Sequence, residues 1–347
     1  MQTPNHSPIA LFPGQGSQQV GMGKDLFENF KIARELFEEA SDATSLNLKK
    51  LCFEGPETDL QLTEHTQPAL LTASIAAFRV AESEIGFKPS VVAGHSLGEY
   101  SALVAAGAIP FSSAVRWVRE RGRAMQIAVP AGQGAMAALM GMEDAAVENL
   151  CAAAVTRAMA KRTVGEVHHM IVDCVLSPAN FNSPGQTVIA GASDALSEAL
   201  VLVKAGGEFA GKAIPLAVSA PFHCALMAPA KMKMAELFSN ATSSEKPSSL
   251  RYAYVPNRTA NLTAEPSVVF ELLVDQVDHP VMWRQSMTTL ISKGYSSAVE
   301  FGPGKVLQGL AKRIAGGIPG ATFTTSGISD SKTLGEWKIA SESKAGT

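Results

Sequence analysis

Residues 89–107 of the chain read PSVVAGHSLGEYSALVAAG, and this stretch decides the fold. Val91 and Val92 follow a proline and are β-branched, which favours a short buried strand. From Leu97 onward strong helix formers dominate, and Gly107 is placed to end a helix. The segment therefore predicts a strand, a tight turn and a helix in immediate succession.

The turn between strand and helix has the pattern G-x-S-x-G, formed by Gly94, Ser96 and Gly98. In this context the pattern is typical of a nucleophile elbow, where a strained backbone lifts the serine hydroxyl clear of the sheet. The residues two before and two after the serine must then be small, and both are glycine. Backbone N–H groups at the start of the helix can receive negative charge. The alternative is an ordinary tight turn that happens to contain serine.

Composition limits what the rest of the chain can be. With 347 residues, 46% of them hydrophobic and 18% charged, the chain is long enough for a large core. A net charge of -3 implies no general attraction to nucleic acid. We see no secretion signal and no apolar run that would span a bilayer, so we expect a soluble, cytoplasmic protein without a membrane partner. The scattered cysteines predict free thiols rather than a disulfide framework or a zinc site.

Short apolar runs alternate with longer helical patterns, which favours an α/β fold with a mostly parallel sheet. Strands are predicted at 9–12, 90–93, 135–140, 187–190, 213–218 and 298–301. Helices are predicted at 24–41, 67–85, 113–128, 143–154, 194–205, 224–238 and 305–315. The segment 330–347 is rich in Ser, Lys and Glu, and is expected to be a mobile tail.

Two glycine-rich stretches resemble nucleotide-binding loops but lack required residues. The run from Gly14 to Gly16 would need a further glycine where the chain has Gln19. The run from Gly302 to Lys305 is followed by Val306 instead of Ser or Thr. Both are predicted as tight turns at strand ends, where ligands bind in open α/β sheets.

A serine hydroxyl needs a positioned base to become a nucleophile. His223 follows the apolar run at 213–218 and a Ser-Ala-Pro turn, which predicts that it lies at the same sheet edge as Ser96. His279, in DHPVMW, is the alternative base. The residue pattern favours His223 without excluding His279.

One arginine lies on the apolar side of the helix predicted at 113–128. Helical spacing gathers on one stripe Ala114, Trp117, Val118, Ala124, Met125 and Ala128. Arg121 falls within this stripe, whereas the other arginines of the helix fall opposite. A buried guanidinium needs a partner. It either pairs with a buried Asp or Glu, or holds the carboxylate of a substrate by a bidentate fork.

Several blocks, in order, resemble bacterial malonyl-CoA:acyl-carrier-protein transacylases, from about Ile9 to Ile314. The blocks are LFPGQGSQQVGMG, TQPALL, GHSLGEYSALVAAG, RGRAMQ, SPANFNSPGQTVIAG, PFHCALM, DHPVMW and EFGPGKVLQGLAKRI. The resemblance implies a hydrolase-like α/β domain over 1–129 and 211–329. It also implies an inserted small ferredoxin-like α+β subdomain over 130–210.

The resemblance also implies roles for individual residues. Ser96 would carry the malonyl group as an ester, His223 would act as base and then acid, and the backbone carbonyl of Gln276 would orient the histidine. The N–H groups of Gln15 and Leu97 would form the oxyanion hole, and Arg121 would hold the malonyl carboxylate. Substrate-binding positions implied in the same way are Gln67, Asn180, Asn182 and Phe222.

The implied activity is malonyl transfer from malonyl-CoA to the phosphopantetheine thiol of acyl carrier protein, for fatty acid synthesis. It needs no cofactor beyond the substrate. The alternatives are a trans-acting acyltransferase of polyketide assembly, an α/β serine hydrolase, and a carrier-docking module without activity. One departure from the family is a longer link at 156–173, within the predicted small subdomain. The resemblance further implies that Phe222 favours malonyl over methylmalonyl groups. A pocket discriminates against one added methyl by only about 1–3 kcal/mol, so the implied preference is modest.

Overall fold

The structure is a computed structural model that describes residues 6–164, 171–218 and 220–345. The chain forms two compact units. The large unit comprises Met1–Gly122, Asn240–Val269 and Ser286–Thr347. The small unit comprises Arg123–Ser239 and Phe270–Gln285, so it extends beyond the subdomain predicted at 130–210.

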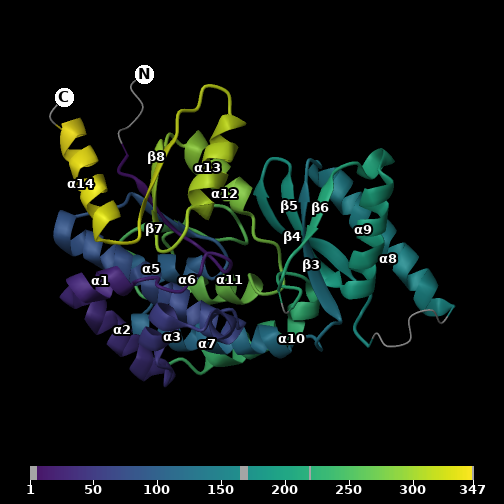
Figure 1. Ribbon diagram of the computed structural model, residues 1–347, viewed down its shortest axis with the longest axis horizontal. Coiled ribbons are helices and arrows are strands. Elements are labelled where there is room, and N and C mark those ends of the chain that lie inside the picture. The colour runs from purple at the N-terminus through teal and green to yellow at the C-terminus, as the bar shows by residue number, and fades with distance from the viewer. Residues whose placement is uncertain (1–5, 165–170, 219, 346–347) are drawn as a thin grey trace. The chain divides into compact units, whose positions relative to one another are not determined.

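A five-stranded parallel sheet forms the centre of the large unit, in the order β7-β2-β1-β8-β9. Figure 1 labels two of its strands, β7 and β8. Its strands are β1 (Ile9–Phe12), β2 (Val91–Gly94), β7 (Ala253–Val255), β8 (Ser297–Phe301) and β9 (Thr324–Ile328). Every residue of β1 and β2 is buried. Parallel strands covered on both faces read as continuous apolar runs, which is why both were predictable from sequence.

Helices fill the connections between these strands. Between β1 and β2 lie α1 (Lys24–Asn29), α2 (Lys31–Thr44), α3 (Leu48–Glu54), α4 (Glu57–Leu60) and α5 (Thr63–Ile85). After β2 come α6 (Gly98–Ala105) and α7 (Phe111–Ile127). Further along are η3 (Pro266–Val268), α11 (Val269–Asp275), α12 (Trp283–Ser292), α13 (Val306–Gly316) and α14 (Ser331–Ala345). The alternation confirms the predicted α/β class.

The expectation of a mobile tail is wrong for the residues that form α14. This helix begins where the Asp25 carboxylate accepts hydrogen bonds from the Ser331 backbone N–H (2.6 Å) and hydroxyl (3.0 Å). Leu334 is buried, and the Trp337 ring lies 5.3 Å from that of Phe87 in an edge contact. Polar composition suggested disorder, but two apolar residues three apart anchor one helix face to the core.

The small unit contains an antiparallel sheet in the order β4-β5-β3-β6. Its strands are β3 (Gly134–Met140), β4 (Leu176–Ser183), β5 (Gln186–Ala192) and β6 (Lys212–Pro215). With α8 (Asp144–Thr163) and α9 (Ser193–Ala205) they follow one another as βαββαβ. The helices and the sheet enclose a core that includes Leu139, Leu150 and Ile189. This is the ferredoxin-like arrangement that the resemblance implied. The unit also holds η1 (Gly207–Phe209), η2 (Ala225–Met227) and α10 (Ala228–Ser239).

One part of the sequence argument for His223 is wrong. The apolar run at 213–218 was expected to form a strand of the sheet that carries Ser96. Instead β6 pairs with β3 in the antiparallel sheet of the small unit. Apolar periodicity identifies a strand but does not say which sheet it joins. A shared sheet edge therefore gives no argument for placing His223 beside Ser96.

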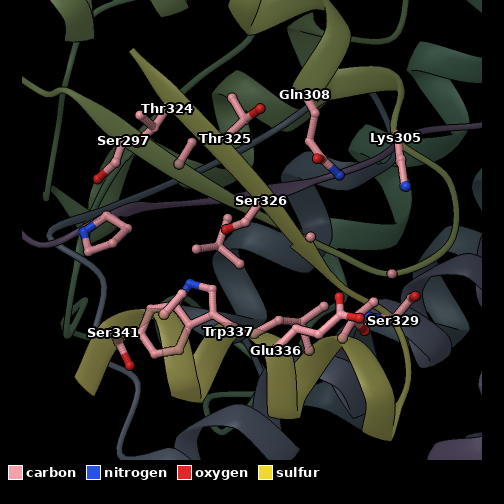
Figure 2. Close-up of a pocket in the computed structure, with 18 of the residues that line it drawn as sticks. Ser297, Lys305, Gln308, Thr324, Thr325, Ser326, Ser329, Glu336, Trp337 and Ser341 are labelled. Carbon is pink, nitrogen blue, oxygen red and sulfur yellow. Dashed lines mark hydrogen bonds between the residues drawn. The ribbon is translucent and has the colours of Figure 1, made fainter. Parts of the chain in front are cut away.

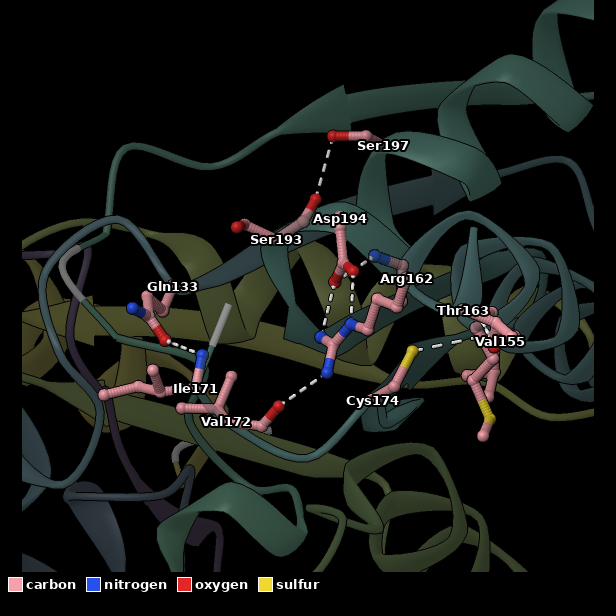
Figure 3. Close-up of polar contacts among 12 residues, drawn as sticks. Gln133, Val155, Arg162, Thr163, Ile171, Val172, Cys174, Ser193, Asp194 and Ser197 are labelled. Carbon is pink, nitrogen blue, oxygen red and sulfur yellow. Dashed lines mark hydrogen bonds and ion pairs between the residues drawn. The ribbon is translucent and has the colours of Figure 1, made fainter. Parts of the chain in front are cut away.

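The segment 156–173, predicted to be a longer link than in the family, begins within α8, and ion pairs fasten this end of the helix to α9 (Figure 3). Arg162 donates to both carboxylate oxygens of Asp194, at 2.7 and 2.9 Å, and to the Val172 carbonyl at 2.7 Å. Arg157 and Lys161 both pair with Glu198. Arg157, Lys161 and Arg162 thus have partners within the small unit. Residues 165–170 lie outside the described part of the chain.

The start of α7 is held to a loop of the large unit by Glu245. Its carboxylate accepts from Arg116 (2.5 Å), from the Ser113 hydroxyl (3.1 Å), and from the Thr242 N–H and hydroxyl (both 2.9 Å). The Thr242 N–H and then Arg116 lower the pKa of Glu245 from 4.5 to about 2. The contacts favour the charged carboxylate, so their stabilisation is complete above pH 4.5 and is lost as the pH falls toward about 2.

We predict that Glu245→Gln lowers the free energy of unfolding at neutral pH by roughly 1 kcal/mol, because the charged contacts are partly exposed. The loss should shrink as the pH falls through the range from 4.5 to about 2. Urea unfolding at a series of pH values measures it. Glu236→Gln, which removes an exposed ion pair with Lys233, is the control and should change stability little. An equal loss at both ends of the pH range would contradict the assignment.

Candidate active site

The turn at Ser96 has the strained geometry of a nucleophile elbow. Ser96 adopts a left-handed backbone with φ 53°. A Cβ atom on Gly94 would lie 1.9 Å from the Gly98 carbonyl oxygen, and one on Gly98 would lie 2.0 Å from that of Phe12. No side chain fits at either glycine. The structure thus confirms the strand–turn–helix prediction and gives the reason for both glycines.

The loop after β1 runs close beside this elbow. The His95 N–H donates to the Phe12 carbonyl at 3.0 Å, and a Cβ on Gly14 would lie 2.5 Å from the His95 carbonyl oxygen. Gln15 follows in this loop, and its side chain donates to the Thr63 hydroxyl at 3.3 Å. Leu97 stands at the N-terminus of α6. First-turn N–H groups have no acceptor within their own helix, so this end can stabilise an anion.

Arg121 lies next to the serine. Its side chain is 1% exposed, Nη2 donates to the Ser96 hydroxyl at 3.2 Å, and Nη1 donates to the Gln67 side-chain oxygen at 2.9 Å. The guanidinium carbon lies 5.7 Å from the centre of the Tyr100 ring. Burial lowers the pKa of Arg121, and the nearby Tyr100 and Glu99 raise it. An arginine keeps its charge even when buried, so a cation sits beside the hydroxyl.

Close packing of two helices brings Arg121 to Gln67. A Cβ on Gly122 would lie 2.6 Å from the Thr63 carbonyl oxygen, so glycine lets α7 approach the start of α5. The helix predicted from residue 67 begins at Thr63, which puts Gln67 and Pro68 inside its N-terminal part. Gln67 is 2% exposed. The structure thus gathers Ser96, Arg121 and Gln67 at one place in the large unit.

The small unit holds His223 in a defined orientation. The residue is 3% exposed, has a left-handed backbone with φ 60°, and its Nδ1 lies 2.8 Å from the backbone carbonyl oxygen of Gln276. A carbonyl only accepts, so Nδ1 carries the proton and Nε2 presents a lone pair. Gln276 follows α11 and is fully buried. The pairing of these two residues agrees with what the resemblance implied.

The alternative base, His279, has a different setting. Its side chain is 37% exposed, and Nδ1 lies 2.6 Å from the Asp278 carboxylate and 2.9 Å from the Asp275 carbonyl. Lys231 pairs with both of these aspartates. His279 is therefore part of a surface ion-pair cluster, whereas His223 is enclosed.

The remaining implied substrate positions also lie in the small unit. Asn180 and Asn182 are on β4, and both are half-buried. Asn180 forms a parallel bridge with Val281, and the Phe181 N–H donates to the Val281 carbonyl at 3.0 Å. This pairing places β4 beside the segment that follows Gln276. Phe222, next to His223 in the chain, is 8% exposed.

Sequence reasoning missed Asn257, which lies behind the elbow. It is 1% exposed, and its side chain bonds with the Ser96 N–H and the Gly94 carbonyl, both at 2.6 Å. The signal was faint: the preceding strand, β7, has three residues and was not predicted. Had β7 been predicted as the neighbour of β2, an asparagine two residues beyond its end would have pointed to this role.

The structure supports the rejection of the phosphate-loop interpretation at 302–305. The buried Glu300 side chain accepts from the Leu307 and Gln308 N–H groups at 3.2 and 3.1 Å, so a side chain of the protein already occupies the N-terminus of α13. A polar hollow of about 660 Å³ lies alongside, between β9, α13 and α14 (Figure 2). The residues that line this hollow do not include Ser96, Arg121 or Gln67.

Two kinds of feature are absent from the described residues: a metal-binding group of side chains and a membrane-spanning helix. Over 6–164, 171–218 and 220–345, no three His, Cys, Asp or Glu side chains are grouped so as to hold a metal ion. Within the same ranges, no helix is both long and apolar enough to cross a membrane.

The parallel sheet and its serine elbow define the class, an α/β protein built like serine hydrolases and acyltransferases. The acyl transferase domain family matches residues 10–338. The chain belongs to this family. Malonyl CoA-acyl carrier protein transacylase of Escherichia coli (strain K12) is 43% identical over 324 residues, which are 93% of this chain and 96% of that protein. The protein of the same name from Bacillus subtilis (strain 168) is 42% identical over 327 residues, 93% and 94% respectively.

Solved structures agree with this assignment. An acyl carrier protein S-malonyltransferase from Vibrio cholerae has a TM-score of 0.83 and 41% identity, covering 95% of this chain and 99% of that one. A malonyl transacylase in complex with the acyl-carrier protein of a type II polyketide synthase has a TM-score of 0.83 and 38% identity, covering 96% and 99%. Both similarities extend over nearly the whole chain.

Three of the four cysteines are poor rivals to Ser96 as nucleophiles. Cys52, Cys151 and Cys224 are buried, and burial raises the pKa of each thiol to about 12. The Cys224 thiol, next to His223 in sequence, donates to the Pro221 carbonyl at 3.0 Å. The reactive thiolate is thus scarce at neutral pH.

We predict that iodoacetamide at about pH 8 leaves Cys52, Cys151 and Cys224 of the folded protein unmodified, because this pH is far below their raised pKa values. Intact-mass spectrometry measures the modification. Protein unfolded in urea is the control and should take up the reagent at every cysteine. Rapid alkylation of Cys224 in the folded protein would contradict the prediction.

Proposed function

We propose that this protein transfers the malonyl group of malonyl-CoA to the phosphopantetheine thiol of acyl carrier protein, through an ester on Ser96, in fatty acid synthesis. The observation that carries the proposal is the buried Arg121, whose Nη2 lies 3.2 Å from the Ser96 hydroxyl oxygen. A malonyl ester on Ser96 would hold its free carboxylate one methylene group beyond the ester carbonyl. A guanidinium so close to the hydroxyl matches a short acyl group that ends in an acid.

Arg121 would act in two ways in this cycle. Before acylation it donates to the serine oxygen and to Gln67, which are both uncharged acceptors. After acylation the guanidinium would turn to the malonyl carboxylate, which is a stronger, charge-assisted partner. The exchange selects acyl groups with a free acid. It also fixes the ester in one pose, which favours transfer over hydrolysis.

We propose that His223 is the base. Its Nδ1–H is fixed on the Gln276 carbonyl, so Nε2 is the ring nitrogen that would take the Ser96 proton. The serine oxygen attacks the thioester carbon, and the N–H groups of Gln15 and Leu97 stabilise the oxyanion. The carbon–sulfur bond then breaks, and the CoA thiolate leaves with the proton from His223.

The second half-reaction reverses these steps with a different thiol. His223 takes the proton of the carrier's phosphopantetheine thiol, whose sulfur attacks the malonyl-Ser96 carbonyl. The bond between the acyl carbon and the Ser96 oxygen then breaks, and the proton returns from His223 to that oxygen. Asn180, Asn182 and Phe222 would contact the acyl group and the thioester arm. The cycle draws on no cofactor besides the malonyl-CoA substrate.

Two alternatives differ from this proposal in one step each. A serine hydrolase would share Ser96 and His223 but would release free malonate to water. A trans-acting acyltransferase of polyketide assembly would use the same chemistry with another carrier, as the solved complex with a polyketide carrier illustrates for that protein. The buried Arg121 beside the serine favours transfer of a diacid over general ester hydrolysis. A cytoplasmic location stays a prediction that cell fractionation would test.

We predict that malonyl-CoA without a carrier yields a stable malonyl adduct on Ser96. Intact-mass spectrometry followed by peptide mapping measures the adduct and its position. Ser96→Ala should give no adduct and no transfer to carrier protein. Rapid release of malonate without an adduct would instead indicate a hydrolase, and transfer that survives Ser96→Ala would refute the covalent mechanism.

We predict that Arg121→Ala lowers kcat/KM for malonyl-CoA on the order of 100-fold or more, because removing one partner of a buried charge pair costs about 2–5 kcal/mol. Activity with acetyl-CoA should rise relative to malonyl-CoA, since acetyl has no carboxylate to hold. Arg119→Ala is the control: Arg119 lies on the same helix but donates to the Thr44 carbonyl. An equal drop with both substrates would mean that Arg121 is only structural.

A further inference from the structure

A single buried asparagine holds both ends of the strained turn that carries Ser96. Asn257 lies two residues beyond β7, the strand that pairs with β2 on the side away from β1. Val255, the last residue of β7, is in register with Ala93. The chain therefore continues past β7 directly beside the elbow.

The Asn257 side chain uses both halves of its amide on the elbow backbone. Its Oδ1 accepts from the Ser96 N–H at 2.6 Å, and its Nδ2 donates to the Gly94 carbonyl at 2.6 Å. These two backbone groups flank His95. A carboxylate would offer only acceptors and an aliphatic side chain neither, so asparagine is the residue of this size that satisfies both.

Buried Glu99 holds Asn257 in turn. The Asn257 N–H donates to Glu99 Oε2 at 3.0 Å, and Glu99 is 0% exposed. Glu99 lies in the first turn of α6, where the helix dipole favours negative charge. The contacts form a continuous chain from Glu99 through Asn257 to the nucleophile.

We infer that Asn257 is a positioning residue that fixes the Ser96 hydroxyl for attack, and that Glu99 supports it. The inference rests on the proposed role of Ser96 as nucleophile. A left-handed serine persists only where its surroundings overdetermine the backbone. Without the amide, the strained backbone loses two of the hydrogen bonds that hold it, so the turn can shift toward ordinary φ and ψ values and move the hydroxyl from the position proposed for attack. A displacement of about 1 Å at a reacting group can cost on the order of 100-fold in rate.

The test separates placement of the nucleophile from substrate binding. Asn257→Ala and Asn257→Asp are compared with wild type in two rates: labelling of Ser96 by a fluorophosphonate, and single-turnover malonylation by malonyl-CoA. The dissociation constant of malonyl-CoA is measured by calorimetry in variants that also carry Ser96→Ala. Rates are normalised to the protein that elutes as the folded species. Asn47→Ala is the matched control, since it removes a side-chain bond to the Lys50 N–H in α3.

We expect Asn257→Ala to slow both rates by roughly 10- to 100-fold, with the dissociation constant changed less than about threefold. Asn257→Asp keeps the acceptor for Ser96 N–H and loses the donor to Gly94, so it should fall between Asn257→Ala and wild type. Glu99→Gln keeps an acceptor for Asn257 N–H and should slow both rates less than Asn257→Ala. Asn47→Ala should match wild type.

Wild-type labelling rates in folded Asn257→Ala would overturn the inference. If that variant yields no folded protein, Asn257→Asp decides in the same way, and failure of both to fold would make the asparagine a folding residue and overturn the positioning role. A change confined to the dissociation constant would also overturn it. If wild type reacts with the fluorophosphonate but takes no malonyl group, the proposed function fails while the probe still tests Asn257.

Discussion

The close passage of backbone against backbone at the elbow is the constraint on which the site depends. Gly94 and Gly98 have no room for a methyl group, and the left-handed Ser96 between them points its hydroxyl at one place. Arg121 meets the hydroxyl there because Gly122 lets its helix approach the start of α5. The proposed selectivity for an acidic acyl group thus depends on three glycines, none of which contributes a side chain to the site.

Burial of Arg121 strengthens its interaction with a carboxylate and also makes the charge costly to desolvate. An exposed guanidinium would be hydrated and would discriminate weakly between acyl groups, whereas Arg121 at 1% exposure gains much from an arriving carboxylate. In this structure the guanidinium contacts two neutral acceptors and the aromatic face of Tyr100. These contacts partly offset the free-energy cost of burying the guanidinium.

Features set by local pattern were predictable from the sequence, and features set by contacts between distant segments were not. The elbow and the position of Arg121 on an apolar helix face follow from residue type and helical spacing. The sheet that β6 joins, and Asn257 behind the elbow, follow from pairing between remote segments, which periodicity does not encode. The helix α14 was missed because its polar composition outweighs the two residues, Leu334 and Trp337, that anchor it. The resemblance, not the spacing, supplied Gln276.

His223 rests on a peptide carbonyl and not on an acidic side chain. Every amino acid at position 276 would contribute that same oxygen, so no single codon change there deletes the acceptor. The tautomer of the imidazole is thus fixed by the position of the main chain that follows α11. A substitution at position 276 would therefore alter the orientation of this ring only indirectly, by moving the main chain that carries the carbonyl.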